Sequence, residues 1–260
     1  MESHQVSDSH ERIAELIAGS RRIAVLTGAG VSTESGIPDF KSLDQSWDFE
    51  ESREDMLSRP FWQKNPMRFW EVYRATLGST VPNESLEPSS FHRWLVELEA
   101  RPGVQAVDIL TQNVDGLHTK AGSSRVIEAH GNSSRAICLE CKHTVPMASV
   151  ADDPLPMCME PECDMFPVLK PDVSLFFEGV SGIGDFRRAI DRSDLLIVAG
   201  TSLAVGPVNE LPYYAQTILR PTLWISDEEP DPFYHFSHSW IGRLSDFVEE
   251  FGSDMATGSK

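Results

Sequence analysis

The 260-residue sequence predicts an α/β protein built on a doubly wound parallel β-sheet, with a small cysteine-containing domain inserted into it. Three observations support this. Short apolar runs of strand length alternate with segments of helical periodicity, as in parallel sheets with crossover helices. Three of these runs end in polar or glycine-containing turns, where such sheets bind their ligands. All four cysteines lie in one window, from Cys138 to Cys163.

The first half of the chain supplies the start of this sheet. Residues 11–19 have apolar side chains at helical spacing, and the apolar run 22–27 predicts a buried strand that leads into a glycine turn. Residues 90–99 are predicted to be a helix, and 107–111 and 126–128 to be strands. We therefore expect the alternating pattern to begin near residue 12.

The second half continues the alternation after the cysteine window. Residues 186–190 and 209–219 have helical patterns, and the apolar runs 194–199 and 222–226 predict further strands. A closing helix is expected over 240–251, because its apolar residues recur at helical spacing. We thus expect the main domain to comprise residues 12–135 and 170–250.

Residues 41–88 differ in character from the rest of the chain. They combine many charges with seven aromatic residues before position 74, and they lack a strand pattern. A long excursion of this kind inside a domain is usually a functional cover, so we predict a helical cover here. The polar ends of the chain, 1–11 and 252–260, are expected to be disordered.

The composition is that of a globular protein with a formal net charge of −18. This charge argues against direct nucleic-acid binding, which needs a basic surface, and it is compatible with a basic protein substrate or simply with solubility. No apolar run approaches the about 20 residues of a membrane helix, and the N-terminus lacks the features of a signal peptide. We expect an intracellular, cytoplasmic protein without membrane attachment.

The four cysteines form two closely spaced pairs, Cys138-x₂-Cys141 and Cys158-x₄-Cys163. Four thiolates at such spacing are typical of a tetrahedral structural Zn²⁺ site, and residues 136–169 are predicted to be a zinc-binding module. A disulfide or buried free thiols are the alternatives. His143 is a further candidate ligand, although an exposed loop histidine is the simpler interpretation.

The first strand-end turn contains Gly28 and Gly30, which allow backbone N–H groups to approach a phosphate. A tight turn without a ligand would have the same sequence. The turn does not match the fingerprint of hydride-transferring dinucleotide enzymes, because Thr33 replaces the third glycine and no acidic strand end follows about 20 residues later.

The complete set of motifs closely resembles the sirtuin family of NAD-dependent protein deacylases. The resemblance covers residues 12–250 and rests on GAGVSTESGIPDF (28–40), TQNVDGLH (111–118), AHG (129–131), the cysteine pairs and GTSLAVGP (200–207). It implies a Rossmann-like sheet, NAD as co-substrate, a structural Zn²⁺ and an acyl-lysine protein or peptide as substrate. The oligomeric state is not implied.

The resemblance also implies a role for individual residues. His130 would be the general base, and Asn113 and Asp115 would hold the nicotinamide carboxamide; His118 is interpreted as structural. The implied NAD-contacting residues are Gly28, Ala29, Gly30, Ser32, Ile37, Asp39, Phe40, Gln112, Gly200, Thr201, Ser202 and Ser226. The implied zinc ligands are Cys138, Cys141, Cys158 and Cys163.

The implied chemistry matches these residue types. The glycosidic bond to nicotinamide breaks, the acyl oxygen attacks the ribose carbon, and His130 deprotonates a ribose hydroxyl so that the acyl group can migrate. The products would be deacylated lysine, nicotinamide and O-acyl-ADP-ribose. A protein ADP-ribosyltransferase and a non-catalytic NAD or ADP-ribose sensor are the alternatives, and His130 favours deacylation over both.

Four positions depart from the family pattern. Lys41 stands in place of an arginine and Ser226 in place of an asparagine, which weakens or shortens two NAD contacts. Phe177 replaces a glycine in a segment that pairs with the substrate backbone, so it is expected to block close approach or reshape the acyl tunnel. Tyr73 lacks its partner arginine, because Thr76 occupies that position, which disfavours succinyl or malonyl substrates.

Overall fold

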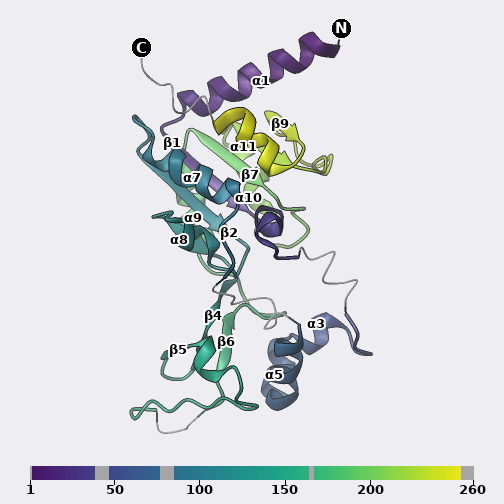
Figure 1. The fold of residues 1–260 in the computed structure, drawn as a ribbon, viewed down its shortest axis with the longest axis vertical. Coiled ribbons are helices and arrows are strands. Elements are labelled where there is room, and N and C mark those ends of the chain that lie inside the picture. The colour runs from purple at the N-terminus through teal and green to yellow at the C-terminus, as the bar shows by residue number, and fades with distance from the viewer. Residues whose placement is uncertain (1, 39–46, 77–84, 164–166, 253–260) are drawn as a thin grey trace.

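The computed structural model describes residues 2–38, 47–76, 85–163 and 167–252. It has two parts (Figure 1): a large parallel sheet covered by helices, and a smaller antiparallel sheet beside the short helices of the cover. The predicted residues Asp39, Phe40 and Lys41, and the predicted tail 253–260, lie outside the described residues.

The large sheet has six parallel strands in the order β3-β2-β1-β7-β8-β9. Their bounds are β1 Arg22–Thr27, β2 Ala106–Thr111, β3 Val126–Glu128, β7 Leu195–Ala199, β8 Thr222–Ser226 and β9 His238–Ile241. The strand order runs outward in both directions from β1 and β7, so the topological switch point lies between them. The predicted doubly wound parallel sheet is confirmed.

Helices cover both faces of this sheet because its strands alternate their buried side chains between two hydrophobic cores. On one face lie α1 Glu2–Gly19, α7 Ser90–Ala100 and α11 Leu244–Gly252, whose Trp94 and Phe247 pack against Ile23 and Val25. On the other face lie α9 Ile183–Arg192 and α10 Glu210–Thr217, which pack against Ala24 and Leu26.

Two elements differ from the sequence prediction. The chain between 238 and 241 is the edge strand β9, and the last helix begins only at Leu244. The pattern was ambiguous because Trp240, Leu244, Phe247 and Phe251 recur at helical spacing across the boundary. At the other end, α1 begins at Glu2 and includes residues expected to be disordered; this polar extension has no apolar periodicity by which to recognise it.

The small sheet consists of β4 Gly131–Ile137, β5 Thr144–Pro146 and β6 Lys170–Val173, in the order β5-β4-β6. It is antiparallel and reaches beyond the predicted limits 136 and 169 on both sides. The division of the chain at those two residues remains a prediction. The cysteine window thus lies between β4 and β6, the two strands that join the small sheet to the main domain.

The helical cover comprises α3 Arg53–Met56, α4 Arg59–Lys64 and α5 Pro66–Ala75. Its aromatic side chains form one hydrophobic cluster with the small sheet, and the indole N–H groups of Trp62 and Trp70 both donate to the carbonyl of Leu169, at 3.2 and 3.0 Å. The cover and the cysteine module therefore share a core that is separate from the two cores of the large sheet.

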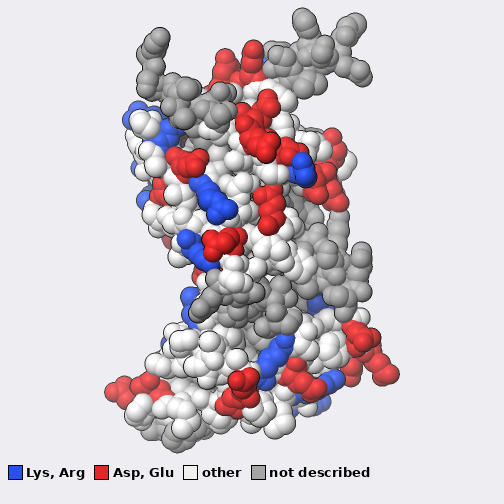
Figure 2. Space-filling model, in the orientation of Figure 1, with Lys and Arg blue, Asp and Glu red and all other residues white. Residues whose placement is uncertain are grey.

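Acidic and basic side chains are intermixed over the face shown in Figure 2. Among the helices of the described ranges, none has the length and apolar character to cross a bilayer.

Candidate active site

The carboxyl ends of β1, β2 and β7 meet at the switch point and bring three of the predicted motifs together. The short helix η1, Ala29–Ser35, follows β1 directly. Gly30 N–H donates to the Gly200 carbonyl at 2.8 Å, and Gln112 N–H donates to the Thr27 carbonyl at 2.9 Å. Residues that are far apart in the sequence therefore form one continuous polar surface.

The glycines in this surface are required by packing between the loops. A Cβ atom added to Gly28 would lie 2.6 Å from Cβ of Thr201, and one added to Gly30 would lie 2.8 Å from Cα of Gly200. Gly200 itself has φ +58°, in the left-handed region. The sequence predicts that these glycines leave room for a phosphate. In the structure, the missing Cβ atoms also leave room for the neighbouring loop to pack closely.

We expect Gly30→Ala to destabilise the protein by about 1–3 kcal/mol, because the new methyl group meets backbone that cannot move aside easily. It should also weaken dinucleotide binding, since the loops would separate. Thermal melts and calorimetric NAD titrations would measure both effects. Gly19→Ala is the matched control, because a Cβ there has no atom within 4 Å. Equal behaviour of the two variants would contradict the packing argument.

Asn113 and Asp115 are held in a hydrogen-bonded chain next to η1. The Asn113 side-chain Nδ2 donates to the Gly28 carbonyl at 3.1 Å and to Ser32 Oγ at 3.0 Å. Ser32 Oγ in turn donates to Asp115 Oδ2 at 2.7 Å, and Leu117 N–H donates to Asp115 Oδ1 at 2.9 Å. Both Nδ2 hydrogens of Asn113 are engaged, so its Oδ1 is the atom that a ligand would meet.

The remaining predicted NAD-contacting residues surround this chain. Gln112 Nε2 donates to Thr201 Oγ1 at 2.8 Å and so joins the β2 and β7 loops. Ile37 N–H donates to the Ser32 carbonyl at 3.3 Å, Ala29 is half-buried and Ser202 is exposed. Ser226 is buried at the end of β8, where its hydroxyl is 3.3 Å from Asp227 Oδ1 and accepts from Glu228 N–H at 3.4 Å.

His130 lies between β3 and β4, half-buried, with its Nδ1 2.8 Å from the Gln112 carbonyl oxygen. A carbonyl only accepts hydrogen bonds, so Nδ1 carries the proton in this pair and Nε2 is the unprotonated nitrogen. Burial lowers the pKa of His130, and the bond to Gln112 offsets part of this effect. The ring is therefore neutral near pH 7, with Nε2 able to accept a proton.

His118 is buried behind the site, as the structural interpretation requires. Its Nε2 is 2.9 Å from Thr27 Oγ1, and its ring centroid is 4.4 Å from that of His92. His92 belongs to a capping box at the start of α7, where Ser89 Oγ donates to the Val31 carbonyl at 2.8 Å. No sequence motif pointed to His92, although the serine three residues before it is a capping signal.

Lowering the pH should destabilise the fold through this histidine pair. Burial lowers the pKa of His92 to about 4 and that of His118 well below its ordinary value, with Asp115 raising and Arg93 lowering the His92 value to smaller extents. The unfolded chain binds these protons near pH 6.5 and the folded chain does not. The free energy of unfolding therefore keeps its full value above about pH 6.5 and decreases as the pH falls toward 4. The decrease is about 3 kcal/mol for His92 alone.

Urea unfolding at pH 7 and at pH 4.5 would measure this loss. His92→Gln should have a smaller difference between the two pH values than the parent protein, because one titrating group is gone. An unchanged difference would assign the acid sensitivity to other groups.

The four cysteines converge on one point. Cys138 Sγ lies 3.8 Å from Cys163 Sγ, Cys141 Sγ lies 3.7 Å from Cys158 Sγ, and all four sulfurs are within 4.8 Å of one another. Tetrahedral thiolates at about 2.3 Å from Zn²⁺ would be about 3.8 Å apart, so the donor set fits zinc. None of the four is in a disulfide, and His143 pairs instead with Glu160 at 3.1 Å.

Two of the departures from the family pattern lie in described parts of the small module and cover. Phe177 has φ +67° and is 77% exposed, and its expected effect on substrate approach or on the acyl tunnel stays a prediction. Tyr73 is buried in the aromatic cluster of the cover, and Thr76 Oγ1 donates to the Val72 carbonyl of its own helix at 2.8 Å.

Comparison with known proteins identifies relatives of this arrangement. The model of the Sir2 family matches residues 28–207. The NAD-dependent protein deacetylase of Chromobacterium violaceum is 43% identical over 203 residues, 78% of this chain and 80% of that protein. The NAD-dependent protein deacetylase of Bacillus cereus is 34% identical over 244 residues, 94% of this chain and 98% of that protein.

Solved structures agree with the fold. A Sir2 homologue in complex with NAD superposes with a TM-score of 0.80 at 30% identity, covering 95% of this chain and 93% of the other. Sir2Tm bound to a propionylated peptide superposes with a TM-score of 0.77 at 26% identity, covering 95% and 98%. The motifs, the sheet topology and the four-cysteine cluster agree with these likenesses, and the chain belongs to the Sir2 family.

Proposed function

We propose that this protein is an NAD-dependent protein-lysine deacetylase, which transfers the acyl group of an acyl-lysine protein or peptide to ADP-ribose. The observation that carries the proposal is His130, whose Nδ1 is held by the Gln112 carbonyl at 2.8 Å, so that Nε2 carries no proton and can accept one. A histidine in this state is a general base, and it adjoins the loops expected to hold NAD.

Asn113 and Asp115 are proposed to hold the nicotinamide carboxamide in one orientation. Asn113 offers its Oδ1 to the carboxamide N–H₂, since its Nδ2 hydrogens are bonded within the protein. Asp115 is fixed by Ser32 and Leu117 and keeps this arrangement rigid. Holding the leaving group in one orientation promotes cleavage of the glycosidic bond by positioning alone.

His130 is proposed to act after that cleavage. It takes a proton from a ribose hydroxyl, which allows the acyl group to migrate, and its neutral form near pH 7 is the form required. Binding of NAD without cleavage would need no such base, which argues against a sensor. Transfer of ADP-ribose to an amino acid would also not require it, which argues against a protein ADP-ribosyltransferase.

The phosphates of NAD are proposed to lie on the β1 and β7 loops, at Gly28, Ala29, Gly30, Ser32, Gly200, Thr201 and Ser202. Gln112 and Ser226 are proposed to contact the two riboses. A bound Zn²⁺ would be held by the four cysteines and would be structural, because a four-thiolate site leaves no open position for a substrate.

The proposal is tested by incubating the protein with NAD and an acetyl-lysine peptide and following both by mass spectrometry. Peptide-dependent release of nicotinamide together with O-acetyl-ADP-ribose is the expected result. A gain of ADP-ribose on a protein, without deacetylation, would establish the transferase instead. Binding of NAD without turnover would establish the sensor.

A further inference from the structure

The chain that leaves β6 forms a turn beside His130. Ser174 N–H donates to the His130 carbonyl at 2.8 Å, and Ser181 N–H donates to the Ala129 carbonyl at 3.1 Å. Both ends of the segment 174–181 are therefore bonded to the backbone on either side of the proposed base. The segment is therefore anchored at both ends to the stretch of backbone that carries His130.

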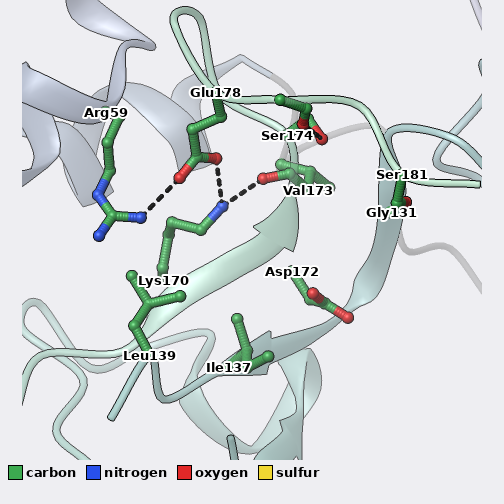
Figure 3. Close-up of a pocket in the computed structure, with 11 residues that line it drawn as sticks. Arg59, Gly131, Ile137, Leu139, Lys170, Asp172, Val173, Ser174, Glu178 and Ser181 are labelled. Atoms are coloured by element: carbon green, nitrogen blue, oxygen red, sulfur yellow. Dashed lines mark hydrogen bonds and ion pairs between the residues drawn. The ribbon is translucent and has the colours of Figure 1, made fainter.

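Three charged groups fix the middle of the segment (Figure 3). Glu178 Oε1 accepts from Arg59 of α4 at 2.7 Å, and its Oε2 accepts from Lys170 of β6 at 2.7 Å. Oε2 also accepts from Leu175 N–H at 2.8 Å, which closes the turn. Lys170 is only 5% exposed, so this triad of Arg59, Lys170 and Glu178 ties the turn to both the helical cover and the small sheet.

Phe177 combines an unfavourable backbone conformation with an exposed aromatic ring. Its backbone has φ +67°, a conformation that side chains with a Cβ rarely adopt, and its ring is 77% exposed. The preceding residue is held on both sides, because Phe176 N–H donates to the Leu57 carbonyl at 3.2 Å and the Phe176 carbonyl accepts from Arg59 N–H at 3.1 Å. Residues held by their neighbours in a rarely populated backbone conformation cluster at active sites and ligand-binding loops.

We propose that Phe177 is a specificity-determining residue, which packs against an apolar side chain of the substrate close to the acyl-lysine, and that the triad positions it. This proposal rests on the deacetylase function proposed above. Phe177 is three residues from Ser174, a span of at most about 11 Å, and an extended peptide advances about 3.3 Å per residue. With the acyl-lysine at the His130 end of the segment, this span corresponds to an apolar side chain within about three residues of it.

The chemistry of the turn favours an apolar side chain over a charged one. Both oxygens of the Glu178 carboxylate are engaged, one by Arg59 and the other by Lys170, so no negative charge is left at the tip of the turn. The group left exposed at the tip of the turn is the aromatic ring of Phe177, which gains from removal from water by another apolar surface.

The test compares two sets of acetyl-lysine peptides, with either leucine or serine at the positions within three residues of the acetyl-lysine. The parent protein should prefer the leucine peptides about tenfold in kcat/KM, through a lower KM, as expected for a buried aromatic contact. Phe177→Ala should abolish the preference. Phe233→Ala, which removes another exposed phenylalanine, should leave it unchanged.

Phe177→Gly separates this role from folding. Glycine tolerates the positive φ, so the variant should melt at or above the temperature of the parent protein and still lose the preference. A Phe177→Gly or Phe177→Ala variant that keeps the leucine preference would overturn the proposal. A parent protein that releases no nicotinamide with either peptide would instead contradict the proposed function.

Glu178→Gln tests the positioning role of the triad. It should raise KM for the leucine peptides about tenfold and leave kcat and the kinetics of the serine peptides near those of the parent protein. Equal losses with both peptide sets would assign Glu178 a general structural role and contradict this part of the proposal.

Discussion

Replacing His130 by alanine is expected to reduce deacetylation by about 10²- to 10⁴-fold, the usual contribution of a positioned general base. NAD binding should be nearly unchanged, because the imidazole bonds to the Gln112 backbone carbonyl, which alanine at 130 leaves in place, and the cofactor loops bond to each other. Steady-state formation of O-acetyl-ADP-ribose measures the first effect, and calorimetric titration with NAD measures the second.

The pH dependence of the reaction should identify the same residue. Burial lowers the pKa of His130, so the base remains neutral at pH values somewhat below the ordinary histidine range. The rate should therefore hold as the pH falls toward 6.5 and decline only below it. His235→Ala, which removes an exposed histidine, is the control and should keep both the rate and its profile. Full activity of His130→Ala would exclude the proposed mechanism.

Replacing Cys158 by serine is expected to release Zn²⁺ and unfold the small module. The binding free energy of a structural four-cysteine zinc site is about 10 kcal/mol or more, and it is available only in the folded state. Cys138, Cys158 and Cys163 are also buried in the core that the module shares with the helical cover, so the aromatic cluster should loosen with them. Zinc content and near-ultraviolet circular dichroism would measure both losses.

The large sheet should survive this change, because its two hydrophobic cores contain no residue of the cysteine module. Far-ultraviolet circular dichroism should therefore retain most of its helical signal after Cys158→Ser or after chelation. Met159→Ala is the matched control, since this neighbour of Cys158 is 76% exposed and should retain zinc. Full zinc content in Cys158→Ser would contradict the four-thiolate site.

The strands of the large sheet were the most accurately predicted elements. Buried parallel strands are continuous apolar runs, and β1 and β8 have the bounds predicted from those runs. The short, half-buried strand β3 also has its predicted bounds. The edge strand β9 was missed because it is half-exposed and its tryptophan shares a helical spacing with α11. The small sheet was also missed, because β4 and β5 carry too few apolar residues to produce a strand pattern.

The sequence by itself determined where the chemistry lies. The motifs after three buried strands had to meet at one edge of the sheet, because parallel strands place their carboxyl ends together. The cysteine spacing likewise predicted a four-thiolate zinc site, because two closely spaced pairs are typical of tetrahedral Zn²⁺ ligands. The strand-end motifs and the cysteine spacing are local patterns, and the order of parallel strands follows simple rules. Both can therefore be recognised in the sequence.

Only the tertiary structure decided how these groups are held. The neighbours of Gly30 and Gly200, the proton on His130 Nδ1 and the exposure of Phe177 all depend on contacts between segments that are distant along the chain. Such contacts are set by the packing of whole elements, which no local pattern encodes. The meeting of these motifs at one edge of the sheet was therefore predictable, whereas the hydrogen bonds that hold them there were not.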